Sequence, residues 1–223
     1  MMDDPPIDNQ VFADLFGEQR LMAIFRGLGV RRSLELADQA WSLGIGVVEL
    51  PVQSADDLEA LRAVARAGAA HGRAVGAGTV VDPTVMATLV EAGARFTVSP
   101  GLDERVALAS AQAGLPPLPG VATASEVQRA MALGLTWLKA FPASLLGTGW
   151  FGAMAGPFPD AIFVATGGMT AYNAGEFLAA GARVVAVGSA LSDPDQLSAL
   201  RTFGAKSTPG VDSGAEVGRA GDR

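Results

Sequence analysis

Residues 45–79, IGVVELPVQSADDLEALRAVARAGAAHGRAVGAGT, contain the unit that decides the predicted fold. An apolar run at 45–50 leads into an Ala-rich amphipathic stretch at 55–70, and a second apolar run follows at 73–77. Continuous apolar runs, unlike alternating ones, indicate strands that are buried on both faces, as in a parallel sheet. Gly72, which lies between the amphipathic stretch and the second run, is typical of the end of a helix. The segment therefore predicts two parallel strands joined by a helix.

The same unit recurs along the chain. Apolar runs that predict strands lie at 21–26, 45–50, 73–77, 95–99, 115–119, 136–141, 161–166 and 183–188. Helices are predicted between them, over 31–43, 55–70, 83–92, 103–113, 123–132, 146–154, 170–180 and 193–201. Eight such units predict an α/β fold, a compact (β/α)8 TIM barrel. The alternative is a doubly wound open sheet, which is less favoured because no Gly-rich dinucleotide turn follows the first strand.

The local signals agree with one barrel domain over residues 8–203. Residues 8–18 predict a short additional helix before the first strand. Residues 204–223 are rich in Gly, Ser and charge, and predict a flexible tail that contains Lys206. Helix starts are marked by Asp82-Pro83, by Thr123 with Glu126 and by Asp193-Pro194.

The composition excludes several classes of protein. Among 223 residues, 49% are apolar and 17% are charged, which excludes a disordered chain. A net charge of −7 argues against nucleic acid as a partner, since phosphate contacts need clustered Lys and Arg. The absence of Cys and the single His exclude disulfides, thiolate catalysis, Cys-ligated metals and a multi-His zinc site.

No segment of the sequence predicts a membrane partner. The uncharged stretches 106–125 and 140–159 are interrupted by prolines, so neither is a continuous apolar helix. The N-terminal MMDDPPIDNQ has neither a basic region nor an apolar core, and therefore does not resemble a signal peptide. A cytoplasmic location is expected.

Two charged residues lie inside predicted strands. Lys139, in TWLKAFP, is one of only two lysines in the chain, and Glu49 lies in GVVELPV. Burial lowers the pKa of a lysine and leaves an amine that can attack a carbonyl. Glu49 could then serve as a general acid and base. The structural alternatives are an ion pair between the two residues, or a Lys139 side chain that extends to the barrel rim.

Further polar residues follow the ends of other predicted strands, where barrels of this kind carry their function. The glycines of 166–168 and 188–189 follow the last two strands, the usual phosphate position, although such glycines also form plain turns. Thr79 could bind a substrate carboxylate or cap a turn. Arg26 suits bidentate binding of a carboxylate, or a salt bridge at the rim.

These residues lie in eight motifs, which are AIFRG, VVELPVQS, GAGTV, FTVSPGL, PLPGVATASE, LKAFPAS, GPFPDAIFVATGGM and VAVGSAL. Taken together, they resemble the class I aldolases of 2-keto-3-deoxy-6-phosphogluconate (KDPG), 2-keto-3-deoxy-6-phosphogalactonate and 4-hydroxy-2-oxoglutarate (KHG). The resemblance implies that Lys139 forms a Schiff base with the substrate and that Glu49 is the acid–base residue. It also implies a substrate site lined by Arg26, Gln53, Thr79, Pro100, Phe141, Thr166, Gly167, Gly168, Gly188 and Ser189.

The sequence departs from this pattern at one position. The phosphogluconate enzymes often carry Arg four residues after the Glu, and this chain has Gln53 there. Arg26 is therefore expected to hold the substrate carboxylate. ELPVQS and FRG look more like the phosphogalactonate branch.

The implied activity is that of a carbon–carbon lyase that needs neither cofactor nor metal. It would cleave a phosphorylated keto acid to pyruvate and glyceraldehyde 3-phosphate, and the family implies a homotrimer. Two other classes fit the barrel and its phosphate position, namely a phosphosugar isomerase or epimerase and a non-catalytic phosphosugar-binding protein. Neither class has a use for both Lys139 and Glu49.

Overall fold

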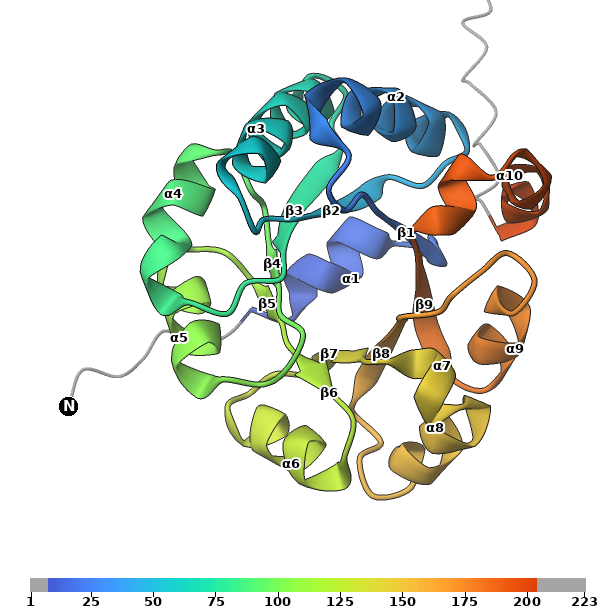
Figure 1. Cartoon of the computed structure of the whole chain (residues 1–223). Helices are drawn as coiled ribbons and strands as arrows, with labels where there is room; N and C mark the ends of the chain where they lie inside the picture. The colour runs from blue at the N-terminus through green and yellow to red at the C-terminus, as the bar shows by residue number, and fades with distance from the viewer. Residues whose placement is uncertain (1–7, 204–223) are drawn as a thin grey trace, which may run out of the picture.

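Parallel strands form an inner ring and helices an outer ring in a computed structural model, which describes residues 8–203 (Figure 1). The strands are β1 Leu21–Ile24, β2 Val47–Pro51, β3 Ala74–Gly78, β4 Thr97–Val98, β5 Pro117–Leu118, β6 Gly120–Val121, β7 Trp137–Ala140, β8 Ile162–Thr166 and β9 Ala182–Val187. Their order is β5-β4-β3-β2-β1-β9-β8-β7-β6, and the paired strands are parallel. Ring order follows chain order, which confirms the predicted barrel.

The ring closes through one proline-containing segment. The sequence predicts one strand over 115–119, and the structure corrects this to β5 and β6, separated by Pro119. Proline has no N–H to give to a strand ladder. Its carbonyl still accepts the Lys139 N–H at 2.9 Å, while β5 pairs with β4 and β6 pairs with β7. The segment 117–121 thus joins the two edges of the sheet.

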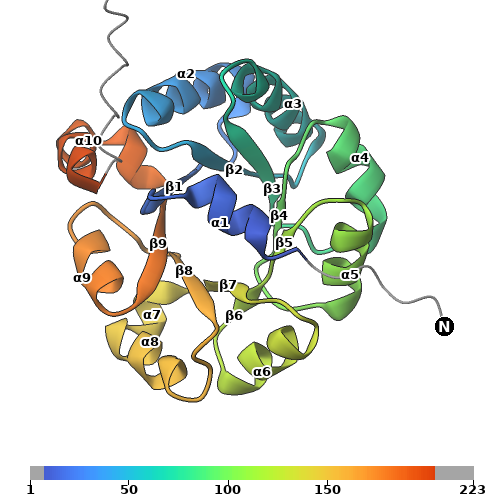
Figure 2. The same ribbon diagram turned by 180° about the vertical axis from the view of Figure 1, so that it is seen from behind.

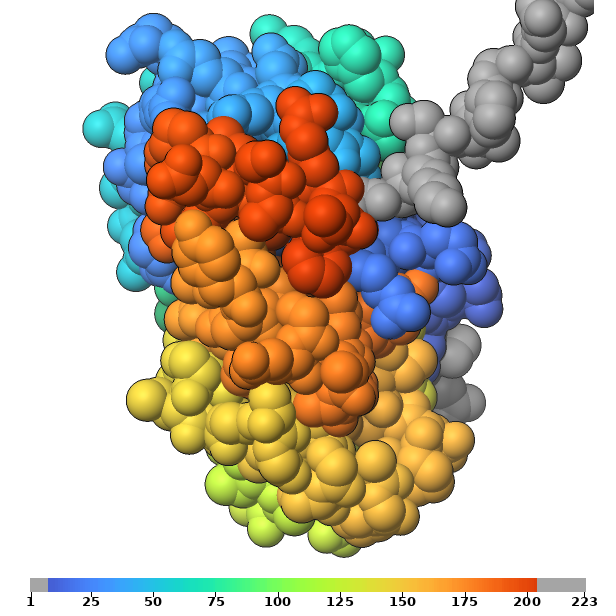
Figure 3. Space-filling model, turned by 90° about the vertical axis from the view of Figure 1, so that its right-hand side faces the viewer, coloured from blue at the N-terminus to red at the C-terminus, as the bar shows by residue number. Residues whose placement is uncertain are grey.

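Apart from α1 Gln10–Phe16, the helices cover the outside of the ring (Figure 1). They are α2 Gly29–Ser42, α3 Ala55–Ala70, α4 Met86–Glu91, α5 Glu104–Gln112, α6 Ala124–Ala132, α7 Ala143–Leu146, α8 Thr148–Ala155, α9 Ala174–Ala179 and α10 Pro194–Leu200. Short 3-10 turns are η1 Pro83–Val85, η2 Ser189–Ser192 and η3 Arg201–Phe203. In the side view of Figure 3, α8, α9 and α10 follow one another across one flank, from yellow to red.

Three predicted helices differ from the observed ones. The one predicted over 83–92 begins as the 3-10 turn η1, and α4 starts only at Met86. The helix predicted over 146–154 is broken at Gly147, whose φ of 76° belongs to the left-handed region, so α7 and α8 are separate. The helix predicted over 170–180 starts only at Ala174. The preceding residues form a turn instead, because Thr170 N–H donates to the Asn173 side chain at 2.9 Å.

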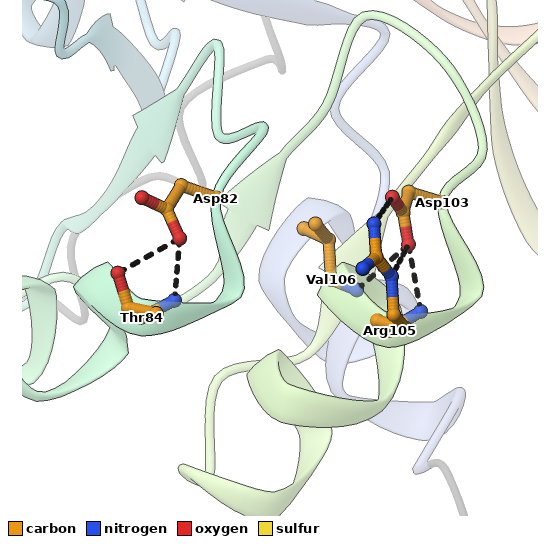
Figure 4. Close-up of polar contacts among 5 residues, drawn as sticks. All are labelled: Asp82, Thr84, Asp103, Arg105 and Val106. Carbon is orange, nitrogen blue, oxygen red and sulfur yellow. Dashed lines mark hydrogen bonds and ion pairs between the residues drawn. The ribbon is translucent and has the colours of Figure 1, made fainter.

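Side-chain caps fix where several helices begin (Figure 4). Asp82 Oδ1 accepts the Thr84 N–H at 2.8 Å, which lowers the pKa of the Asp82 carboxyl. Asp103 accepts the Arg105 N–H at 2.9 Å and pairs with the Arg105 guanidinium at 3.0 Å. The predicted caps at Asp82, Thr123 and Asp193 are confirmed, and Thr123 forms a full capping box with Glu126.

Alternation along each strand divides the apolar residues into two cores. Residues that face outward pack against the helices in the larger core, as Val48 and Leu138 do. Residues that face inward form a second cluster inside the ring: Phe12, Phe16, Met22, Val47, Phe96, Val98, Leu118, Trp137, Val164, Val184 and Ala186. Because side chains alternate, the residue two places after an inward-facing one also faces inward.

One end of the ring is closed by α1, which lies across the strands in the view from behind (Figure 2). The ring centroids of Phe12 and Phe16 lie 5.8 and 5.4 Å from that of Trp137, the first residue of β7. Asn9 Nδ2 donates to Gly134 O at 2.7 Å, and its Oδ1 accepts the Thr136 N–H at 2.9 Å. The amino end of the barrel is therefore filled, and the opposite end is left to hold a cavity.

Residues 204–223, predicted as a tail, lie outside the described residues. Within 8–203, no helix is long and apolar enough to cross a membrane. The same residues contain no cluster of three or more His, Cys, Asp or Glu that could hold a metal ion.

Candidate functional site

A cavity of about 670 Å³ opens at the carboxyl ends of the strands. Its lining consists of Ile24, Arg26, Leu28, Glu49, Lys139, Phe141, Thr166, Gly167, Gly168, Met169, Thr170, Ala186, Gly188, Ser189 and Ser192. Glu49 follows the inward-facing Val47 by two residues, and Lys139 follows Trp137 in the same way. Since β2 and β7 lie four places apart in the ring, their side chains approach the cavity from opposite sides.

Glu49 is wholly buried, and its two carboxylate oxygens have no hydrogen-bond partner among the described residues. Burial raises the pKa of the Glu49 carboxyl, and the positive charges of Lys139 and Arg26 oppose that rise. The carboxyl has room because Gly78, the last residue of β3, has no side chain. A Cβ at that position would lie 2.0 Å from Glu49 Oε1.

Lys139 is 4% exposed, and burial lowers the pKa of its ammonium group. The negative charge of Glu49 opposes this shift, and the positive charge of Arg26 adds to it. The Nζ atom lies 4.8 Å from the centroid of the Phe141 ring. In this environment Lys139 loses its proton at a lower pH than a free lysine does. The neutral amine that results is the form that attacks a carbonyl carbon.

Arg26 lines the same cavity and is held by Gln53. Its Nη1 donates to Gln53 Oε1 at 2.7 Å. Gln53 itself lines a neighbouring groove of about 360 Å³, together with Thr79. Pro100 lines a third hollow, of about 250 Å³. The structure thus brings together nine of the residues named from the sequence, and it places Gln53, Thr79 and Pro100 beside the cavity rather than in its lining.

Two glycine turns form the side of the cavity at β8 and β9. Gly167 and Gly168 have φ values of 94° and 73°, a conformation that suits only glycine at low cost. The Gly167 carbonyl accepts the Ser144 N–H at 3.0 Å, and the Gly168 carbonyl accepts Asn173 Nδ2 at 3.0 Å. Beside them, the Thr166 hydroxyl is buried and has no hydrogen-bond partner among the described residues.

The sequence analysis missed two residues that shape this site. Gly78 provides the space for the Glu49 carboxyl, and a glycine inside a strand is a known signal of close approach. Asn173 holds the Gly167–Gly168 turn from behind, because its Nδ2 donates to the Gly168 carbonyl. The sequence gives only a weak indication of this role, because an Asn three residues after Thr170 is equally typical of an ordinary helix cap.

A family model for KDPG and KHG aldolases matches residues 13–202. The KHG/KDPG aldolase of Escherichia coli strain K12 is 37% identical over 157 residues, which cover 70% of this chain and 73% of that protein. A probable 2-dehydro-3-deoxy-6-phosphogalactonate aldolase of Rhizobium meliloti is 33% identical over 178 residues, or 79% of this chain and 84% of that protein.

Solved structures agree with this match. The crystal structure of KDPG aldolase from Legionella pneumophila, with pyruvate captured at low pH as a covalent carbinolamine intermediate, shares 28% identity. Its TM-score is 0.74, and the likeness covers 85% of this chain and 94% of that chain. The chain described here belongs to the KDPG and KHG aldolase family and is an aldolase, a carbon–carbon lyase.

Proposed function

We propose that the protein is a Schiff-base aldolase that cleaves a 2-keto-3-deoxy-6-phospho sugar acid to pyruvate and glyceraldehyde 3-phosphate. The observation that carries this proposal is the pairing of a buried amine and a buried, unpartnered carboxyl across one cavity. Burying both groups is costly for folding, and such pairs are found where their chemistry is needed. Family membership supports the reaction class.

The first half of the reaction forms the covalent intermediate. The neutral Nζ of Lys139 attacks the C2 ketone and gives a carbinolamine. Glu49, whose raised pKa keeps a proton available, donates that proton to the carbinolamine hydroxyl. Water leaves, and an iminium ion links C2 to Lys139.

The second half breaks the C3–C4 bond. The Glu49 carboxylate takes the proton of the C4 hydroxyl, and the C4 oxygen becomes the carbonyl oxygen of glyceraldehyde 3-phosphate. The electron pair of the C3–C4 bond moves toward the iminium nitrogen and leaves an enamine. Glu49 returns the proton to C3, and water then hydrolyses the new iminium. Pyruvate and the neutral amine of Lys139 are released, and the proton left over returns to the Glu49 carboxylate.

The remaining cavity residues account for the two ends of the substrate. The guanidinium of Arg26 suits the carboxylate, since it can donate two parallel hydrogen bonds. The glycine turns at 167–168 and 188–189 suit the phosphate, because backbone N–H groups without side chains can approach its oxygens. Phe141 in the cavity lining, together with Thr79 and Pro100 beside the cavity, is proposed to bound the pyruvyl end.

Trapping with pyruvate and borohydride tests the proposal. Reduction of the imine should leave a stable adduct on the peptide that contains Lys139, and Lys206 is the internal comparison. Lys139→Arg should retain the fold and lose cleavage, since a guanidinium cannot supply a neutral amine. An adduct only at Lys206, or none at all, would overturn the Schiff-base mechanism and leave an isomerase or a binding protein as the alternatives.

We further propose that the enzyme accepts both C4 epimers, with a modest preference for the phosphogalactonate form. The support is the neutral Gln53 amide beside Arg26, because an amide can donate or accept a hydrogen bond. The ratio of kcat/KM values for the two epimers measures this preference. A preference for the gluconate form beyond about a hundredfold, roughly 2.7 kcal/mol, would contradict it.

We also propose that the protein acts as a homotrimer in the cytoplasm. The support is the family resemblance for the trimer, and the sequence composition for the location. Light scattering on the purified full chain measures the assembly, and a monomeric mass at micromolar concentration would reject the trimer.

A further inference from the structure

The Gly167–Gly168 turn is held from outside the cavity by two hydrogen bonds. The Gly167 carbonyl is bound by the Ser144 N–H, and the Gly168 carbonyl is bound by Asn173 Nδ2, both at 3.0 Å. Neither Ser144 nor Asn173 belongs to the cavity lining, whereas Gly167, Gly168 and Met169 do. Both carbonyls are therefore turned away from the cavity.

The direction of these carbonyls fixes the direction of the next N–H groups. In a planar trans peptide, the C=O and the N–H point in opposite directions. The Gly168 N–H accordingly points away from Ser144, and the Met169 N–H points away from Asn173. Successive backbone N–H groups in a turn form a concave anion site, and Gly167 and Gly168 form such a turn with positive φ at both residues.

We infer that Asn173 is a positioning residue that presets this turn for the phosphate of the substrate. Its amide is fully engaged, since Nδ2 holds Gly168 O while Oδ1 accepts the Thr170 N–H at 2.9 Å. The Asn173 N–H in turn donates to Thr170 Oγ1 at 3.3 Å. Without the Nδ2 bond, the Gly168–Met169 peptide is free to rotate its carbonyl toward the phosphate. The inference rests on the proposed function, because that function supplies the phosphate.

The chain contains a matched control for this contact. Asn9 uses its amide in the same way, with Nδ2 on Gly134 O and Oδ1 on the Thr136 N–H. These two hydrogen bonds of Asn9 lie at the amino end of β7, away from the cavity. Asn9→Asp and Asn173→Asp therefore remove the same kind of bond at the two ends of the barrel.

The experiment compares Asn173→Ala, Asn173→Asp and Asn9→Asp with the wild-type protein. The KM of the phosphorylated keto acid and the inhibition constant of inorganic phosphate report on the turn. The yield of borohydride-reduced pyruvate adduct reports on the rest of the site, because pyruvate has no phosphate. Thermal unfolding is recorded for every variant.

Both Asn173 variants should raise the KM and the phosphate inhibition constant about ten- to hundredfold, because the Met169 N–H would no longer be held toward the phosphate and one hydrogen bond to a charged group would be lost. The kcat and the yield of pyruvate adduct of both variants should stay within about threefold of wild type, a much smaller change than the loss of one such hydrogen bond would cause. Asn9→Asp should lower the unfolding temperature and leave both phosphate readouts unchanged.

Three outcomes would overturn the inference: unchanged phosphate readouts, an equal loss of pyruvate adduct and phosphate binding, or a loss in Asn173→Asp alone, which would reflect the added charge. If wild-type protein forms no adduct and cleaves no substrate, the proposed function itself fails.

Discussion

The two ends of the barrel share one ring of strands and differ in what fills them. At the amino end, Phe12 and Phe16 stack against Trp137, and Asn9 satisfies both polar atoms of its amide. At the carboxyl end, the oxygens of Glu49 and the hydroxyl of Thr166 are buried without a hydrogen-bond partner among residues 8–203.

The amino end of the barrel therefore contributes to stability, whereas the carboxyl end holds the groups that can react. A buried polar atom that lacks a partner costs about 1–3 kcal/mol, and a charged one costs more. Buried aromatic rings at the other end contribute in the opposite direction. The carboxyl end is thus arranged to gain hydrogen bonds when a ligand enters, while the amino end holds the ring together.

The largest expected effect concerns Glu49 at the carboxyl end. Glu49→Gln keeps the shape of the side chain but cannot take up or release a proton at C4. We expect kcat to fall by about two to four decades, the usual range for general acid–base catalysis, with the fold intact by circular dichroism. Near-full turnover of this variant at every pH would show that Glu49 acts only through its charge or its packing.

Phe16→Ala should produce the reverse pattern at the amino end. Phe16 is wholly buried against Trp137, so its truncation should lower the free energy of unfolding by about 3–5 kcal/mol. The yield of pyruvate adduct per folded molecule should not change. Urea denaturation and borohydride trapping measure the two quantities on one preparation. A large loss of adduct from the folded protein would show that the two ends are coupled.

The fold was predictable because its signals are local and repeated. Apolar runs recur along the chain, and Gly72, the predicted end of a helix, has a positive φ. Gly44 after α2 and Gly93 after α4 have a positive φ as well. The ring also fixes the site, since parallel strands bring Glu49 and Lys139 to the same end. The sequence therefore sufficed for the barrel and for its central pair.

The remaining features depend on contacts that no local pattern contains. The predicted strand over 115–119 is divided at Pro119, which has no N–H to give to a neighbouring strand. This division depends on how β5 pairs with β4 and β6 with β7. The late start of α9 depends on Asn173, which binds back to Gly168 instead of continuing the helix. Gln53 follows the end of β2, where strand alternation no longer sets the side-chain direction, so its position outside the cavity lining was not foreseeable.

A smaller effect on stability and on kcat is expected from a substitution at Gly78, whose missing side chain leaves space for the Glu49 carboxyl. At Gly78 an added Cβ meets Glu49 Oε1, whereas at Gly152, on the outside of α8, it meets nothing within 4 Å. Gly78→Ala should lower the free energy of unfolding by about 1–3 kcal/mol through overpacking, and should lower kcat as well. Gly152→Ala should raise the free energy of unfolding by about 0.5–1 kcal/mol, because alanine is the better helix former. Equal effects at both positions would mean that Gly78 does not make room for Glu49.

The smallest expected effect is a shift in the titration of Lys139, and its sign differs between two variants. The Glu49 carboxylate raises the pKa of the Lys139 ammonium, and the Arg26 guanidinium lowers it. Glu49→Gln should therefore move the Lys139 midpoint to lower pH, and Arg26→Gln should move it to higher pH. Arg129→Gln, on the outer helix α6, should move nothing.

The chain allows this measurement to be direct. With lysine labelled at Cε by ¹³C, the spectrum contains only the signals of Lys139 and Lys206, and Lys139→Arg assigns them. In wild-type protein the Lys139 signal should titrate below a free lysine, because burial disfavours the ammonium. A wild-type midpoint at or above that of free lysine, or shifts of the same sign in both variants, would remove the electrostatic basis for a neutral amine at this end of the barrel.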